Sequence, residues 1–117
     1  MKTIITGLIL LLGFLIGCAP EPIFYWGNYS ETLYRYKKSP DQKTLEEHKK
    51  SLADIFDESA RRHKQVPPGV SAEYGYLLLK DGKEAEGLPY LDKEQALYPE
   101  SSIFIQRLKD EAQRGKK

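Results

Sequence analysis

Residues 18–117 contain little from which a β-sheet could be built. Their only valines are Val66 and Val70, and no stretch alternates β-branched with polar residues, which is the pattern of a half-buried strand. Apolar residues recur instead at the spacing of amphipathic helices. One hundred residues form one small domain with a modest core. The sequence therefore predicts an all-α fold, with the domain at residues 24–113 and a basic tail at 114–117.

The amino-terminal segment has the order of an export signal. Met1 and Lys2 give a short basic start, residues 3–14 are almost wholly apolar, and small residues precede Cys18. This order is typical of a signal peptide that is removed after export. As a helix, residues 3–17 would span about 22 Å, which is less than the roughly 30 Å of the hydrocarbon core. The segment is therefore too short for a membrane-spanning anchor.

The signal ends in a motif that resembles the lipobox of bacterial lipoproteins: Leu15, Ile16, Gly17 and Cys18. The resemblance implies that residues 1–17 are a lipoprotein signal peptide and that Cys18, the only cysteine, carries the lipid. Ala19 stands where many inner-membrane lipoproteins of enteric bacteria have aspartate, so the resemblance implies the outer membrane, at its periplasmic face. The alternative is a soluble secreted protein, in which a lone cysteine at this place would be a coincidence.

Residues 18–23 form a short tether between the lipid and the domain. Even fully extended, the five residues after Cys18 reach no more than about 20 Å, and Pro20 and Pro22 stiffen them. The domain is therefore expected to lie close to the surface of the bilayer.

Aromatic residues are densest directly after the tether. Tyr25, Trp26 and Tyr29 are candidates for contact with lipid headgroups or with a partner. The alternative is that these rings pack in the core against the first helix. That helix is expected at residues 29–38, because Asn28 stands three residues before a glutamate and resembles the start of a capping box.

A second, longer amphipathic helix is expected at residues 40–64, which contain no glycine and no proline after position 40. Both histidines, His48 and His63, fall on or beside its apolar stripe. They are fifteen residues apart, which is over about 20 Å along a helix, so they cannot share a metal ion, and we expect them to pack at helix interfaces. The predicted stripe consists of Leu45, Leu52, Ile55, Phe56 and Ala60.

The second half of the domain resembles one degenerate tetratricopeptide repeat, a pair of antiparallel helices with a 34-residue period that ends in Pro99. In this register Gly75 and Gly87 are the small residues that let the two helices approach each other. Glu94 stands where alanine is usual, and Pro89 lies within the second helix, which it would kink or start late. The implied contacts within this helical hairpin are Tyr74, Gly75, Leu78, Gly87, Leu91 and Pro99.

Together with the lipobox, the stretches 25–30, 72–79 and 98–102 resemble one small family of Gram-negative lipoproteins known as a domain of unknown function. The resemblance covers nearly all of residues 18–117. It implies an outer-membrane lipoprotein that is often encoded beside two others, one of them similar to the curli secretion channel. It implies no catalytic residue.

The sequence gives no motif for catalysis or for cofactor binding. It has no nucleophile elbow, no phosphate-binding glycine loop and no His-Glu-x-x-His. Without Lys2, 17 basic side chains face 17 acidic ones, so there is no electrostatic basis for binding nucleic acid. We expect a non-enzyme with no cofactor, no metal site and no small-molecule substrate.

The expected function is a protein–protein interaction module of the cell envelope, held at the membrane by the lipid on Cys18. Its partner is expected to be another envelope protein, such as a neighbouring lipoprotein. The alternatives are a regulator of a cell-wall synthase and a purely structural surface lipoprotein. The candidate contact residues on the helical hairpins are Tyr74, Tyr76, Tyr90 and Tyr98.

Overall fold

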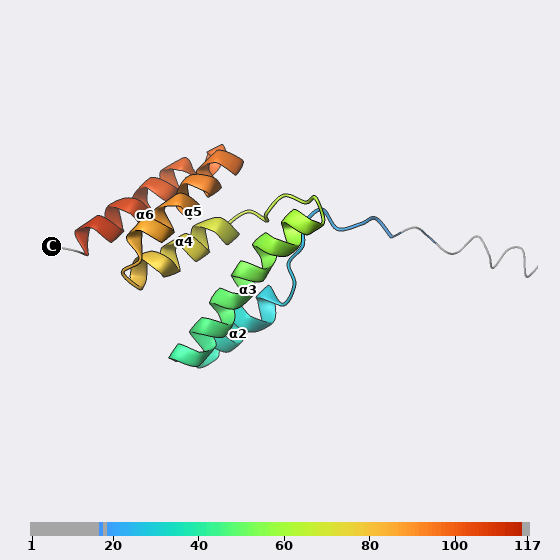
Figure 1. Ribbon diagram of the computed structural model, residues 1–117, viewed down its shortest axis with the longest axis horizontal. Helices are drawn as coiled ribbons and strands as arrows, with labels where there is room; N and C mark the ends of the chain where they lie inside the picture. Colours follow the sequence, from blue (N-terminus) through green and yellow to red (C-terminus); the bar gives the residue numbers. More distant parts are fainter. Residues whose placement is uncertain (1–16, 18, 116–117) are drawn as a thin grey trace, which may run out of the picture.

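The computed structural model describes residue 17 and residues 19–115 (Figure 1). Cys18, Leu15 and Ile16 lie outside the described residues, and Gly17 is exposed. Within the described part there are helices and no strand, which confirms the predicted all-α fold. The elements are α2 (Tyr29–Lys38), α3 (Gln42–Arg61), α4 (Val70–Lys80), α5 (Glu84–Leu97), the 3-10 helix η2 (Pro99–Ser101) and α6 (Ser102–Arg114).

The helices form two hairpins and a closing helix. α2 packs against α3, and α4 packs against α5 in the most extensive contact of the fold. α6 then lies along the second hairpin and contacts both α4 and α5 (Figure 1). None of the helices within residues 19–115 is both long enough and apolar enough to cross a bilayer.

The first helix has the predicted bounds but not the predicted cap. The side chain of Asn28 makes no capping hydrogen bond to α2. Its Oδ1 atom instead accepts a hydrogen bond of 3.2 Å from the hydroxyl of Ser51 on α3. The predicted capping box at Asn28 is therefore wrong, because the side-chain amide of Asn28 binds α3 and does not cap α2.

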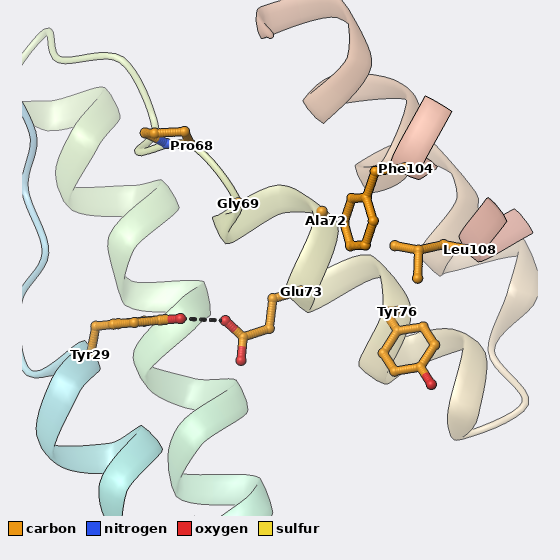
Figure 2. A pocket seen from close by; sticks show the side chains of 8 residues that line it. All are labelled: Tyr29, Pro68, Gly69, Ala72, Glu73, Tyr76, Phe104 and Leu108. Carbon is orange, nitrogen blue, oxygen red and sulfur yellow. Dashed lines mark hydrogen bonds between the residues drawn. The ribbon is translucent and has the colours of Figure 1, made fainter. Parts of the chain in front are cut away.

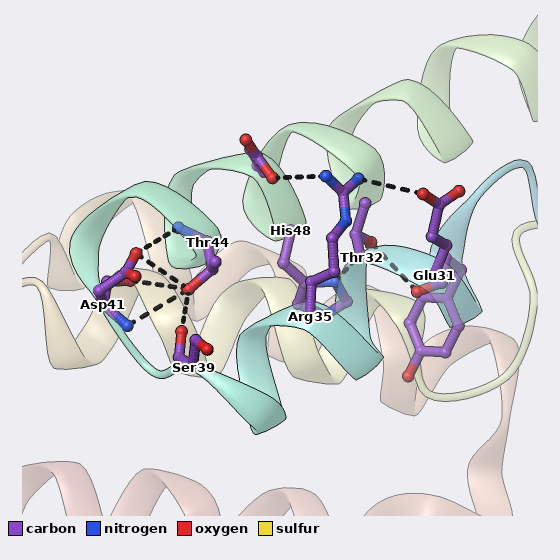
Figure 3. Close-up of polar contacts among 9 residues, drawn as sticks. Glu31, Thr32, Arg35, Ser39, Asp41, Thr44 and His48 are labelled. Atoms are coloured by element: carbon purple, nitrogen blue, oxygen red, sulfur yellow. Dashed lines mark hydrogen bonds and ion pairs between the residues drawn. The ribbon is translucent and has the colours of Figure 1, made fainter.

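The second helix is held at its start by a reciprocal cap (Figure 3). Asp41 Oδ1 accepts from the Thr44 backbone N–H at 2.8 Å, and the Asp41 N–H donates to Thr44 Oγ1 at 3.2 Å. Together these bonds satisfy amide groups that the first turn of a helix leaves unpaired. The helix ends at Arg61, shortly before His63 takes a positive φ of 52°. It is thus shorter at both ends than predicted.

The buried stripe of α3 differs from the prediction in one position. Leu52 and Ile55 are fully buried, as predicted, but Ala60 is exposed and Ser59 is buried in its place. His48, Leu52, Ile55 and Ser59 follow a spacing of four, three and four residues, which keeps them on one face at 3.6 residues per turn. A neighbour of Ser59 is turned by about 100° from this face, so Ala60 points to solvent.

The second hairpin is built on a close approach of two glycines. A Cβ on Gly75 would lie 2.7 Å from the carbonyl oxygen of Gly87, and a Cβ on Gly87 would lie 2.7 Å from the oxygen of Gly75. Leu78 and Leu91 are buried beside them. α5 begins at Glu84 and continues through Pro89. The predicted alternative that Pro89 delays the start of this helix is therefore wrong.

Two apolar clusters make up the core, and α4 contributes to both. One cluster joins α3, the linker between α3 and α4 (residues 62–69), and α4 through Leu52, Ile55, Val66, Val70 and Leu77. The other joins α4, α5 and α6 through Ala72, Leu91 and Ile105. α4 therefore holds the two hairpins together.

Candidate functional site

A chain of buried polar side chains connects the first hairpin to α4. His48 is fully buried, and its Nδ1 atom lies 2.9 Å from Thr32 Oγ1 (Figure 3). Its Nε2 atom lies 2.9 Å from Glu73 Oε1, and Tyr29 donates its hydroxyl to Glu73 Oε2 at 2.7 Å (Figure 2). Helices α2, α3 and α4 thus meet in one hydrogen-bonded set, which was not predicted from the sequence.

The hydrogen bonds of this set can be satisfied with His48 neutral or protonated. Because an ionised Glu73 only accepts hydrogen bonds, His48 Nε2 donates to it. In neutral His48, Nδ1 then accepts from the Thr32 hydroxyl. In protonated His48, Nδ1 donates instead, and the Thr32 hydroxyl donates to the Tyr29 carbonyl oxygen, which lies 3.1 Å away. Either state leaves no buried polar atom of His48 without a partner.

Thr32, His48 and Glu73 stand in the order of a nucleophile, a base and an acid, but they are placed for packing. Thr32 is 3% exposed and His48 is 0% exposed, so a substrate in solution reaches neither side chain. His48 therefore packs at a helix interface, as predicted. His63 is exposed, and the prediction that it packs at an interface is wrong.

The pKa values of two neighbouring members of the set, Tyr29 and Glu73, move apart. Burial raises the pKa of Tyr29, and the neighbouring Glu73 carboxylate raises it further. Burial alone would raise the pKa of Glu73. The hydrogen bonds from His48 and Tyr29 and the charges of His48 and Lys37 together outweigh burial, so the pKa of Glu73 is lowered overall. Glu73 is thus held as a carboxylate by its partners.

We expect the set to contribute stability that depends on pH. Since the pKa of Glu73 is lowered in the folded state, its contribution is present above the usual glutamate pKa and is lost as the pH falls from that value through the lowered pKa of the folded state. Glu73→Gln should therefore reduce the free energy of unfolding by about 1–2 kcal/mol at pH 7, with a smaller difference near pH 3. Urea unfolding of both proteins across this range measures the difference. A difference that does not shrink in acid would contradict the assignment.

A second buried carboxylate, Glu94, fixes the start of α4. Glu94 is 3% exposed, and its two oxygens accept from the backbone N–H of Gly69 at 2.7 Å and of Ala72 at 3.3 Å. Gly69 has a φ of 90° and no side chain with which to cap the helix. Glu94 on α5 therefore supplies the missing cap, and a negative charge at this end suits the helix dipole.

Tyr98 completes the attachment of the linker to α5. Its hydroxyl donates to the carbonyl oxygen of Val66 at 2.6 Å. Burial raises the pKa of Tyr98, and the charges of Glu94 and Glu100 raise it further. In the repeat register of the sequence, Glu94 only departs from the usual alanine. In the structure, Glu94 and Tyr98 both fix the linker and the start of α4 to α5.

An open cavity of about 520 Å³ lies beside the buried polar set and is lined by residues of α2, α4 and α6 and by Pro68 and Gly69 (Figure 2). Among its eight lining residues, Glu73 is the only one with a charged side chain. Phe104 is 55% exposed at its edge, and the adjacent Ile103 is 73% exposed. We call this site the Glu73 groove; its lining residues are Tyr29, Pro68, Gly69, Ala72, Glu73, Tyr76, Phe104 and Leu108.

The candidate aromatic contacts predicted from the sequence are divided among several places. Tyr29 and Tyr76 line the Glu73 groove. Tyr74 and Tyr90 pack edge to face with ring centres 4.8 Å apart, and both rings also pack on Phe56. These two tyrosines therefore belong to the packing between the hairpins.

The remaining predicted site residues do not line the groove, although Trp26 packs on Tyr29, which does. Tyr25 lies under the guanidinium of Arg62, 4.6 Å from it. Trp26 is 40% exposed and its ring packs on Tyr29 at 5.3 Å. Pro99 is exposed at the first position of η2. Within residues 19–115, no three side chains of the metal-binding types gather in one place.

Comparison with known proteins gives one family. The sequence model of that family, described as a domain of unknown function (DUF4810), matches residues 23–108. The match covers α2 to most of α6 and begins at Ile23, the last residue of the tether, so it does not include Cys18. No curated protein and no solved structure matches the chain significantly. Because the matched residues make up well over half of the sequence, the chain belongs to the DUF4810 family.

Proposed function

We propose that the chain is a lipid-anchored protein of the cell envelope, whose helical domain binds another envelope protein in the Glu73 groove. The observation that carries the proposal is Phe104, a large apolar side chain that is 55% exposed beside an open cavity. Large exposed apolar side chains beside a concave surface are typical of interaction sites. The buried, inaccessible positions of Thr32 and His48 support a role in binding rather than in catalysis.

The chemistry of the groove defines the segment that it fits. Tyr76, Leu108 and Ala72 offer apolar walls, and Glu73 offers a negative charge with 28% of its side chain exposed. A segment with an apolar side chain next to a lysine or arginine complements both. We therefore propose a basic-apolar segment of a second envelope protein, such as a neighbouring lipoprotein, as the occupant.

The anchor in this proposal rests on the sequence motif at Leu15, Ile16, Gly17 and Cys18. We propose that Cys18 is lipidated and that Ala19 directs the protein to the outer membrane, at its periplasmic face. A multiply acylated cysteine gives a stable attachment, because a single chain binds only marginally. We also propose that α4 and α5 are a degenerate tetratricopeptide repeat. The approach of Gly75 to Gly87 at the predicted register supports this relation.

Site-specific crosslinking in living cells tests the groove. A photoreactive phenylalanine analogue in place of Phe104 should form an adduct with one envelope protein. The same analogue in place of Tyr34, which is 64% exposed on α2, should not form that adduct. Mass spectrometry of the 104 adduct should find an apolar residue beside a lysine or arginine in the captured segment. An acidic captured segment, or the same adduct from both positions, would refute the groove as the binding site.

Substitution of the sole cysteine tests the anchor. We expect Cys18→Ser to abolish incorporation of labelled fatty acid and to leave uncleaved precursor, because serine lacks the thiol that the lipid donor requires. Labelling in cells and the mass of the amino terminus measure both effects. Normal processing of Cys18→Ser would show that the motif is not a lipobox.

A further inference from the structure

The segment that precedes α2 is fixed to the carboxyl end of α3. Lys64 Nζ donates to the carbonyl oxygen of Pro22 at 2.6 Å. Three residues further on, the ring of Tyr25 lies under the guanidinium of Arg62. In Figure 1 this blue segment passes the end of α3 before it turns into α2. The tether therefore leaves the domain from a defined end.

Two apolar side chains between Pro22 and the start of α2 are exposed, although the ring of Trp26 also packs on Tyr29 at 5.3 Å. Ile23 is 79% exposed and Trp26 is 40% exposed. They are three residues apart, so their Cα atoms are separated by no more than about 11 Å. Moving an exposed isoleucine out of water is favourable, and tryptophan is enriched at the headgroup level of membranes. Both residues thus suit a lipid interface better than bulk water.

The charges around this end are largely compensated within the domain. Arg61 and Arg62 pair with Glu58 at 2.8 Å and 3.1 Å. Lys64 pairs with Glu21 at 3.0 Å. The three cations share two acidic partners, because Arg61 and Arg62 both pair with Glu58. The excess charge with which this surface could attract anionic lipids is therefore small. Contact with a membrane would depend on the apolar side chains.

We propose that Ile23 and Trp26 insert into the headgroup region of the bilayer, so that the carboxyl end of α3 faces the membrane. The inference rests on the lipidation of Cys18 proposed above. Ile23 is the fifth residue after Cys18, so it lies within about 18 Å of the lipidated residue. The contact orients the domain, whereas a lipid chain alone would leave it free to rotate.

Fluorescence of the lipidated protein tests this contact, because Trp26 is the only tryptophan in the chain. The protein is purified from membranes, and mass spectrometry first establishes whether Cys18 carries lipid. It is then incorporated into vesicles of neutral phosphatidylcholine, with or without bromine atoms on the acyl chains near the headgroup. We expect the brominated vesicles to quench the fluorescence of Trp26. We also expect Trp26 in vesicles to emit at shorter wavelength than Trp26 in the domain released, without detergent, by proteolysis of the tether.

Matched variants separate insertion from mere proximity. Ile23→Asp should reduce the quenching of Trp26, whereas Ile103→Asp should not, although Ile103 on α6 is exposed to a similar extent, 73%. In a chain with Trp26→Phe and Tyr34→Trp, the tryptophan on α2 should not be quenched.

The outcomes distinguish this inference from the proposed function. Lipidated protein whose Trp26 is not quenched would overturn the inference and leave the anchor intact. Quenching that requires anionic lipid, or equal quenching at position 34, would also overturn it. Protein without lipid on Cys18 would overturn both the anchor and the inference.

Discussion

Gly75→Leu is expected to destabilise the domain by about 3 kcal/mol or more, since overpacking at a close helix contact has costs of this order. A Cβ at position 75 meets the carbonyl oxygen of Gly87 at 2.7 Å. A backbone atom cannot rotate aside as the end of a side chain can, so α4 and α5 would have to separate along their length. Urea unfolding followed by circular dichroism measures the loss. A domain of this size has only about 5–15 kcal/mol of stability in total, so the effect is large.

The matched control is Gly115→Leu at the end of α6. There the nearest atom to an added Cβ lies 3.7 Å away, which is an ordinary contact, and the residue is exposed. We expect a change within about 0.5 kcal/mol. Equal stability of the two variants would show that the helices do not meet at Gly75.

Glu94→Ala has the second largest expected effect, a loss of about 3 kcal/mol. The change removes the acceptor for the backbone N–H groups of Gly69 and Ala72 and leaves them at a buried helix start. Glu94→Gln keeps one acceptor oxygen of the same shape, so we expect it to lose about 1–2 kcal/mol. Thermal and urea unfolding rank the two variants.

An exposed glutamate supplies the control for Glu94. Glu111→Ala on α6 removes the same side chain from the surface and should change the stability by less than about 0.5 kcal/mol. If Glu94→Ala were as stable as Glu111→Ala, Glu94 would not be the cap of α4. Hydrogen exchange of the Ala72 amide gives a local reading of the same bond.

Local patterns in the sequence were sufficient to predict the helices. The apolar spacing around Leu52 and Ile55 predicted α3, and the resemblance to a repeat of fixed period, with Gly75 and Gly87 in register, implied the hairpin of α4 and α5. Both depend on residues close together in the chain or on a fixed helical period. The confirmed part of the prediction is therefore the part that local geometry decides.

The wrong details concern side chains with more than one available partner. Asn28 could cap its own helix, but Ser51 lies within reach and takes its Oδ1 atom. Ala60 and Ser59 differ by one position, and the serine, which continues the spacing of Ile55, is the one that is buried. A local rule states what a side chain can do, while the tertiary contact decides what it does.

The contacts that matter most for the candidate site could not be predicted, because they are distant in sequence. His48 and Glu73 are 25 residues apart, as are Gly69 and Glu94. The position of His48 in the sequence does not indicate which carboxylate it contacts. For Glu94, however, a signal was present: an acidic residue stood at a small, buried position of the repeat register, opposite a helix that begins with an uncapped glycine.

The position of α4 between the two hairpins also determines how cooperatively the domain unfolds. In long repeat arrays each unit contacts only its neighbours, and the ends can fray while the middle stays intact. Here one helix supplies side chains to both apolar clusters and is tied by Glu73 to α3 and by Glu94 to α5. Loss of either hairpin therefore exposes the interior of the other, which couples them into a single cooperative transition.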